Sequence, residues 1–170
     1  MPSPRISWPD VADQVRSWAE RTLGSPVVRW HPQTGGWSPG TADRLVCADG
    51  TRAFLKAAHP GLNPLTPDFY RREIAVARLL GPAVPCAHLL DAHDDGEWVA
   101  LLLEDVEGRH AQLPWRPDEL AAILDALTRL ATATTPVSIP GSFAPPSGTS
   151  RPSRASRGCG RSRRPTSIPG

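Results

Sequence analysis

Residues 42–58 read as two segments of alternating polarity, ADRLVCA and TRAFLKAA, on either side of an Asp-Gly pair at 49–50. Asp-Gly between two such segments is a strong signal for a β-hairpin, because both tip residues of a tight two-residue turn take a positive φ. Side chains alternate between the two faces of a strand, so Phe54 and Lys56 share one face. Lys56 is the only lysine, beside eighteen arginines. The hairpin therefore constrains this part of the chain to an antiparallel sheet and gives its one lysine a fixed face.

The rest of residues 1–135 predicts further helices and strands. Ser7 and Asp10 have the spacing of a helix capping box, and leucines recur at helical spacing after Pro117. Phe69, Ile74, Ala77 and Leu80 are expected near one face of their helix. The expected order is a helix over about 8–23, a strand over 26–33, the hairpin, a helix over 68–80, two strands around the Asp-Gly pair at 95–96, and a helix over 117–131. This order predicts an α+β fold with an antiparallel sheet of about five strands.

Residues 136–170 differ in composition from the rest of the chain. They contain six arginines and no acidic residue, and they consist mostly of Pro, Ser, Arg and Gly without apolar periodicity. The formal net charge of +2 therefore divides into +6 for this segment and −4 for residues 1–135. A segment of this composition cannot bury enough apolar surface to offset its ordering entropy. We expect residues 1–135 to form one domain and residues 136–170 to be a disordered tail.

Cysteine usage and hydropathy bear on the compartment and on metal binding. The three cysteines are odd in number and widely spaced, which favours free thiols in a reducing cytoplasm. The N-terminus lacks an apolar signal-peptide core, and no apolar run has the length of a membrane span. Cys86, His88 and His93 are metal-ligand types, but the two histidines fall on opposite faces of the expected strand. We therefore expect a cytoplasmic protein without membrane association and without a metal site.

Several polar landmarks follow one another in an order that suits ATP. Gly35, Gly36 and Gly40 lie in a turn where the absence of Cβ atoms lets the backbone approach phosphates. Lys56 supplies a compact ammonium charge for phosphate oxygens. Glu73 lies in the following helix and can pair with that ammonium. The apolar run LLLEDVEG then leads into a connector whose backbone groups can meet the edge of an adenine. Together these features favour a nucleotide-binding site.

Residues from about 5 to 132 resemble the N-terminal portion of an aminoglycoside phosphotransferase-type enzyme. The resemblance rests on three segments, GGWSPGTADRLVCADGTRAFLKA, RREIAVARLL and WVALLLEDVEG. It implies a protein-kinase-like N-lobe, with the C-lobe largely absent from these 170 residues. The parent reaction would transfer the γ-phosphoryl group of ATP to a hydroxyl of a small-molecule acceptor. The ATP-binding positions that it implies are Gly35, Gly36, Ser38, Gly40, Lys56, Glu73, Leu103, Glu104 and Val106.

The resemblance also implies a role for each of these positions. The segment Gly35–Gly40 matches the loop that covers the phosphates, and Lys56 matches the lysine that contacts the α- and β-phosphates, with its glutamate partner on the next helix. Leu103 lies where the family guards the back of the adenine pocket. Glu104 and Val106 fall at the hinge that takes adenine by its backbone. The single lysine therefore stands where the family has its ATP lysine.

The resemblance does not extend to the catalytic groups. The family takes its acceptor-orienting carboxylate from a His-Gly-Asp loop with a nearby Asn, and its Mg²⁺ ligands include a later Asp. None of the five histidines begins His-Gly-Asp, the only asparagine is Asn63, and no acidic residue follows Asp125. No catalytic residue and no metal ligand is therefore assigned, although the family uses Mg²⁺. We hypothesise a truncated or frameshifted product that is inactive as it stands.

Two alternatives remain open. A non-catalytic nucleotide-binding or regulatory module would keep Lys56 and Glu73 and lack turnover. An interaction protein would act through its basic tail, in which ASRGCGRSRR could bind nucleic acid by charge. That stretch has no aromatic residue for base stacking, which disfavours nucleic acid. The apolar stripe of the helix over 117–131 would lack its covering lobe, so we also expect self-association.

Overall fold

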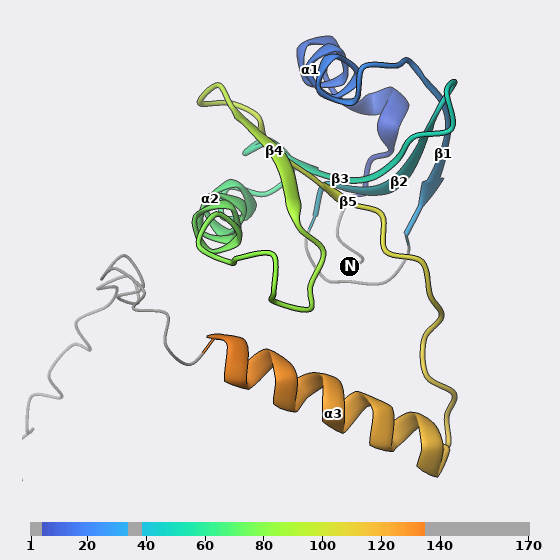
Figure 1. Ribbon diagram of the computed structural model, residues 1–170. Coiled ribbons are helices and arrows are strands. Elements are labelled where there is room, and N and C mark those ends of the chain that lie inside the picture. Colours follow the sequence, from blue (N-terminus) through green and yellow to red (C-terminus); the bar gives the residue numbers. More distant parts are fainter. Residues whose placement is uncertain (1–4, 34–38, 135–170) are drawn as a thin grey trace, which may run out of the picture. The chain divides into compact units, whose positions relative to one another are not determined.

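Figure 1 shows a computed structural model of the protein, which describes residues 5–33 and 39–134. The chain divides into two units, Met1–Ser138 and Ile139–Gly170, and every described residue belongs to the first. The disorder expected for residues 136–170 therefore concerns residues outside the described ranges. The same holds for the glycine-rich turn before residue 39.

The described residues form a single five-stranded sheet, which confirms the predicted α+β class. The strands are β1 (Val27–Pro32), β2 (Thr41–Cys47), β3 (Arg52–Ala58), β4 (Leu89–Asp94) and β5 (Val99–Glu104). They are ordered β1-β2-β3-β5-β4, and each neighbouring pair is antiparallel. The predicted hairpin joins β2 to β3, where Gly50 has a φ of 90° and the Thr51 N–H donates to Asp49 Oδ1 at 2.9 Å. Strand β3 lies at the centre of the sheet, so Lys56 is on the most enclosed strand.

The helices are α1 (Asp13–Leu23), α2 (Thr66–Ala77) and α3 (Pro117–Thr134), preceded by a short 3-10 turn, η1 (Trp8–Asp10). The expected continuous helix over 8–23 is wrong, because Val11 and Ala12 have extended ψ values of 141° and 143°. The capping box of Ser7 and Asp10 starts η1 and not α1. This break turns Trp8 into the core. The helix α1 then ends, as predicted, at Gly24, whose φ is 75°.

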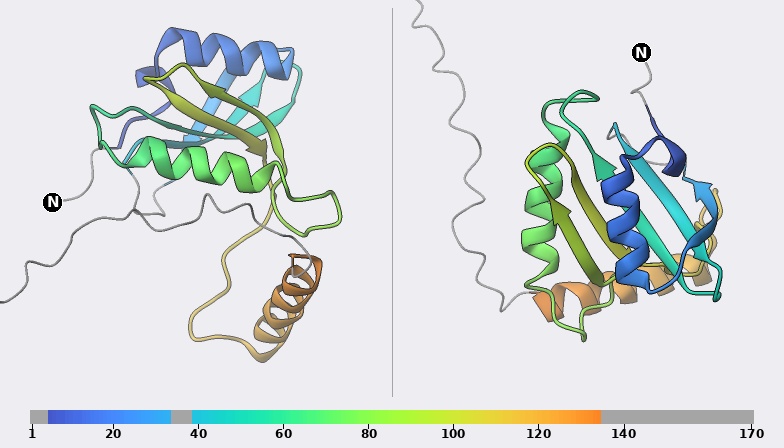
Figure 2. Two further views of the ribbon diagram at one scale, coloured as in Figure 1. Left: turned by 90° about the vertical axis from the view of Figure 1, so that its left-hand side faces the viewer. Right: turned by 90° about the horizontal axis from the view of Figure 1, so that it is seen from above.

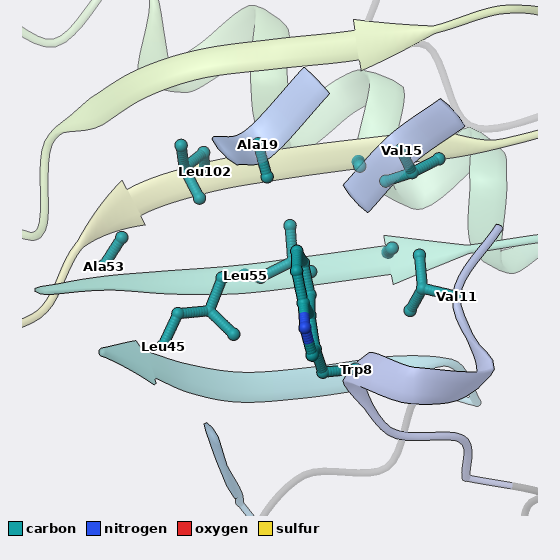
Figure 3. Close-up of a cluster of buried hydrophobic side chains, with 10 residues drawn as sticks. Trp8, Val11, Val15, Ala19, Leu45, Ala53, Leu55 and Leu102 are labelled. Carbon is teal, nitrogen blue, oxygen red and sulfur yellow. The ribbon is translucent and has the colours of Figure 1, made fainter. Parts of the chain in front are cut away.

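One hydrophobic core lies between α1 and one face of the sheet, as Figure 3 shows. Because side chains alternate along β3, Ala53, Leu55 and Ala57 all point to this face. Trp8 points into the same cluster and is 4% exposed, and Val15 of α1 is fully buried. Burial of one such Leu or Val side chain stabilises the fold by roughly 1.5–3 kcal/mol. The core therefore fixes which residues of β3 are left on the other face.

The helix α2 lies on the face of the sheet opposite α1, as Figure 2 shows. A second cluster of buried side chains joins α2 to this face. Tyr70 and Ile74 are one helical turn apart and pack against Val99 and Leu101 of β5. The expectation that Phe69 shares a face with Ile74 is wrong, since Phe69 is 56% exposed whereas Ile74 and Tyr70 are buried. Phe69 lies roughly 100° around the helix from Tyr70, and only one of the two can face the sheet. The helix α2 therefore presents Tyr70, and not Phe69, to the strands.

The helix α3 begins at Pro117, as predicted, and none of its described side chains is buried. Leu120, Leu124 and Leu127 are 39%, 55% and 54% exposed. Self-association through this apolar stripe stays a prediction. Within residues 5–33 and 39–134, no helix is both long enough and apolar enough to cross a membrane.

An ion pair joins α2 to β4. Arg71 Nε lies 2.8 Å from Asp94 Oδ2, and Arg71 Nη2 lies 3.0 Å from Asp94 Oδ1. This hydrogen-bonded guanidinium holds the pKa of the Asp94 carboxyl below its ordinary value. A depressed folded-state pKa means that the carboxylate contributes stability above an unfolded pKa of about 4, and that this contribution is lost as the pH falls toward the folded value.

We therefore expect Asp94→Asn to lower the free energy of unfolding at pH 7 and to have a smaller effect at pH 3. Urea unfolding of both proteins at the two pH values measures the difference. Asp68→Asn is the matched control, because Asp68 contacts the same guanidinium at 2.9 Å but is 66% exposed, and its effect at pH 7 should be smaller. An Asp94→Asn effect of equal size at both pH values would contradict the expectation.

Candidate nucleotide-binding site

Strand alternation gathers five side chains on the sheet face that is turned away from α1. Ala42 of β2 pairs with Lys56 of β3, and Arg44 pairs with Phe54. On the other side of β3, Phe54 pairs with Leu103 of β5. The residues that alternate with them along the strands, such as Leu45 and Leu55, are buried in the core under α1. The sequence pattern that builds the core therefore also aligns these five side chains on the opposite face.

The Lys56 ammonium forms an ion pair with α2. Its Nζ lies 2.8 Å and 2.6 Å from the two carboxylate oxygens of Glu73. It also lies 5.0 Å from the centroid of the Tyr70 ring. Burial, and then the charge of Glu73, raise the pKa of Tyr70 to about 12, so its hydroxyl stays protonated at neutral pH. The carboxylate and the ring together hold the lysine side chain extended over the sheet.

A cavity of about 820 Å³ opens beside this ion pair. Lys56, Glu73 and Tyr70 line one part of it, and the segment 103–110 lines another. Ligand pockets for small molecules commonly have volumes of about 300–1,000 Å³. The predicted residues Lys56, Glu73, Leu103, Glu104 and Val106 thus all border one cavity. Its size and mixed lining fit a nucleotide.

The segment that follows β5 is held in place by two arginines. The Asp105 side chain is 2% exposed and lies 2.7 Å from Arg44 Nε and 2.7 Å from Arg52 Nη2. Arg44 also donates to the Val106 carbonyl. Glu104 is fixed separately, because its N–H donates to the His88 carbonyl at 2.9 Å and its carboxylate accepts the His88 N–H at 3.1 Å. The backbone of this segment is therefore positioned before any ligand arrives.

Several residues that border the cavity were not predicted as site residues, among them Arg44, Tyr70 and Arg5. Arg44 has a detectable signal, because it stands two residues after Ala42 in β2, on the same strand face. Tyr70 could have been found as the residue one turn before Ile74. Arg5 has no such signal, because its position depends on how the N-terminal segment folds back.

Gly40 is placed next to the site but does not border the cavity. Its φ is 125°, and a Cβ atom built there would lie 2.4 Å from the backbone oxygen of Ala57. The close approach of two backbones at the start of β2 therefore requires glycine. Gly35, Gly36 and Ser38 lie outside the described residues, and their role stays a prediction.

Replacement of Gly40 by alanine is expected to lower the free energy of unfolding by about 2 kcal/mol, from positive-φ strain and the overlap with Ala57. Gly50→Ala is the control, because Gly50 also has a positive φ, of 90°, but nothing lies within 4 Å of the new Cβ. It should cost about 1 kcal/mol. Urea unfolding of the three proteins gives both values. Equal destabilisation by the two substitutions would show that the Ala57 contact has no energetic role.

The described residues contain no group of three or more His, Cys, Asp or Glu side chains that could hold a metal ion. Asp105 and Glu107 border the cavity, but Arg52 pairs with both, at 2.7 Å and 2.5 Å. Magnesium prefers several oxygen ligands in octahedral geometry. Within the described ranges, 5–33 and 39–134, the side chains that line the cavity therefore fit a nucleotide better than they fit a metal ion.

No protein-family model matches the chain, and no curated protein matches it. Among solved structures, the chain is similar to a thermostable variant of aminoglycoside phosphotransferase APH(4)-Ia in ternary complex with ADP and hygromycin B, with 16% sequence identity over 74% of the chain and a TM-score of 0.47. A ternary complex of another variant with AMP-PNP and hygromycin B matches with 17% identity over 75% and a TM-score of 0.47.

A putative fructosamine-3-kinase from Haemophilus somnus 129PT matches with 8% identity over 74% of the chain and a TM-score of 0.48. The chain spans 39–40% of the length of these three proteins.

Proposed function

We propose that the chain forms the ATP-binding part of a small-molecule phosphotransferase. The observation that carries the proposal is the Lys56–Glu73 ion pair at 2.6 Å, which borders a cavity of about 820 Å³. An ammonium held on a central strand by a helix carboxylate is a fixed point charge for phosphate oxygens. Lys56 remains 24% exposed, so a ligand in the cavity can reach it.

The other end of the cavity suits a purine base. Phe54 and Leu103 are apolar neighbours on β3 and β5, and both border the cavity. The following backbone at Glu104 and Val106 is fixed by His88 and Arg44. A flat apolar base can lie against the side chains while its polar edge meets the backbone of this segment. The cavity therefore offers an apolar end for the base and a cationic end for the phosphates.

In the proposed parent reaction, the γ-phosphoryl group of ATP passes to a hydroxyl of a small acceptor. Such chemistry depends on positioning and on charge stabilisation. Lys56 would hold the phosphates, Glu73 would orient Lys56, and the segment 104–106 would orient the base. Mg²⁺ would neutralise phosphate charge, but its ligands are not among the residues described, so these residues contribute binding and orientation only.

Titration calorimetry of the 170-residue chain with ATP tests the proposal. We expect ATP to bind, and adenosine to bind more weakly because it lacks the phosphates that Lys56 contacts. Equal dissociation constants for adenosine and ATP would mean that the phosphates are not bound at the site. Absence of any ATP binding would remove the proposed function.

The same chain is expected to bind ATP without transferring its phosphoryl group at an enzymatic rate. None of its five histidines begins a His-Gly-Asp loop, and two of the acids at the base end, Asp105 and Glu107, are paired with arginines. Product formation is measured with radiolabelled ATP and a panel of small alcohols that includes aminoglycosides. Product that forms with the wild type and not with Lys56→Ala would contradict the expectation. Binding without turnover is also the behaviour of a non-catalytic nucleotide-binding module.

A further inference from the structure

The N-terminal segment folds back beside Gly40, at the start of β2. Arg5 forms a parallel bridge with Gly40, and the Ile6 N–H donates to the Gly40 carbonyl at 3.4 Å. A segment that begins thirty-five residues earlier in the chain is thereby brought to the strand end from which β2 runs past Lys56.

This position is fixed by the core. Trp8 is 4% exposed within the α1 cluster. Asp43, which is fully buried, accepts hydrogen bonds from the Trp8 N–H at 2.5 Å and from Ser7 Oγ at 3.1 Å. Arg5 is three residues from this buried tryptophan. The backbone that carries Arg5 is therefore held on both sides, by Gly40 and by Asp43.

The Arg5 side chain reaches the cationic end of the cavity. Arg5 borders the cavity together with Lys56, Tyr70 and Gln33. Its guanidinium donates to the carbonyl of Gln33, the residue that follows β1. Its positive charge acts on Tyr70, the ring that also contacts Lys56. The Gln33 N–H in turn donates to the carbonyl of Ala42, the residue that pairs with Lys56. Arg5 is therefore linked to the part of β2 that lies beside Lys56, whereas Val106 is held by Arg44, which pairs with Phe54.

A triphosphate needs more positive charge than Lys56 supplies. Both carboxylate oxygens of Glu73 already lie within 2.8 Å of the ammonium, so the pair has no net charge. ATP carries three to four negative charges, and Mg²⁺ ligands are not among the described residues. A guanidinium binds phosphate oxygens through two parallel N–H groups, with geometry that an ammonium does not offer.

We infer that Arg5 is a second phosphate-binding residue, which discriminates a nucleoside triphosphate from the nucleoside. The inference rests on the proposed function and adds to it the N-terminal segment as part of the site. Arg5 contacts the β- and γ-phosphates from the Gly40 side, while Lys56 contacts the phosphates from β3. The segment Arg5–Trp8 thus couples the buried core to the phosphate end of the cavity.

The test compares ATP and adenosine binding by calorimetry, using the full chain and the variants Arg5→Gln, Arg5→Lys and Lys56→Ala. Arg29→Gln is the matched control, because Arg29 is an exposed arginine of β1 and loses the same charge. We expect Arg5→Gln to weaken ATP binding about tenfold and to leave adenosine binding and the thermal unfolding midpoint unchanged. Arg5→Lys should retain part of the ATP affinity, and Arg29→Gln should retain all of it.

Each failure has its own signature. If the wild type binds ATP in a Lys56-dependent way and Arg5→Gln binds it equally well, Arg5 is not a phosphate ligand and the proposed function stands. If Arg5→Gln weakens the binding of ATP and the binding of adenosine by the same factor, Arg5 acts on the fold of the N-terminal segment and the inference is overturned. If the wild type binds no ATP, the proposed function and the inference fall together.

Discussion

Replacement of Lys56 by alanine is expected to weaken ATP binding by roughly 10- to 100-fold, which would make it the most damaging change at the candidate site. A hydrogen bond to a charged group contributes about 1.5–3 kcal/mol, and each 1.4 kcal/mol corresponds to a factor of ten. The substitution also leaves Glu73 without its ion-pair partner. Its carboxylate then faces the phosphates and repels them. Titration calorimetry of both proteins with ATP measures the loss.

The double variant Lys56→Ala/Glu73→Ala separates the two contributions. It lacks both charges, so it should bind ATP better than Lys56→Ala alone and worse than the wild type. Lys56→Arg should not restore affinity, because a planar guanidinium cannot take the place of a point charge between Glu73 and Tyr70. If Lys56→Ala binds ATP as tightly as the wild type, Lys56 does not belong to the site.

The central part of the fold could be predicted from the sequence because local signals and burial agree there. An Asp-Gly tip fixes the β2–β3 hairpin, and alternation assigns Leu55 to the core and Lys56 to the other face. The pairing of Lys56 with Glu73 was expected from the resemblance, and the structure has it because α2 covers the face that carries Lys56. In this hairpin the local turn preference and the burial of apolar side chains assign each residue to the same face of the sheet.

The N-terminal segment could not be predicted in the same way. The Ser7 and Asp10 pattern is a true capping box, but it caps a 3-10 turn of three residues. The chain then breaks at Val11 and Ala12, because Trp8 is buried in a cluster built by residues from the sheet. Such a long-range contact outweighs helix propensity and leaves no local signal. The position of Arg5 depends on this contact.

Arg44 and Asp105 show a second limit. Their ion pair joins residues 61 positions apart, and it positions the Val106 carbonyl. An acid in the connector after β5 and an arginine on β2 are both ordinary surface residues when read singly. Only the sheet order, in which β3 lies between β2 and β5, brings them to one edge of the cavity.

Replacement of Asp43 by alanine is expected to lower the free energy of unfolding by about 3–5 kcal/mol, a large part of the roughly 5–15 kcal/mol that stabilises a typical domain. Asp43 is fully buried, and its Oδ2 accepts from Thr41 Oγ1 at 2.9 Å as well as from Ser7 and Trp8. Alanine leaves these buried donors without an acceptor, at about 1–3 kcal/mol each before relaxation. Urea unfolding measures the loss.

Two further variants test whether the loss comes from the buried hydrogen bonds of Asp43. Asp43→Asn keeps one acceptor oxygen and should cost less than alanine. Asp13→Ala removes a side chain that is 90% exposed and pairs with Arg16 one turn away, so it should change stability by less than about 0.5 kcal/mol. Because Asp43 anchors the segment that carries Arg5, the Asp43→Asn protein should also lose ATP affinity while adenosine affinity is kept. Full ATP affinity in a destabilised Asp43→Asn protein would mean that the hydrogen bond between Asp43 and the Trp8 N–H stabilises the core but does not position Arg5 at the cavity.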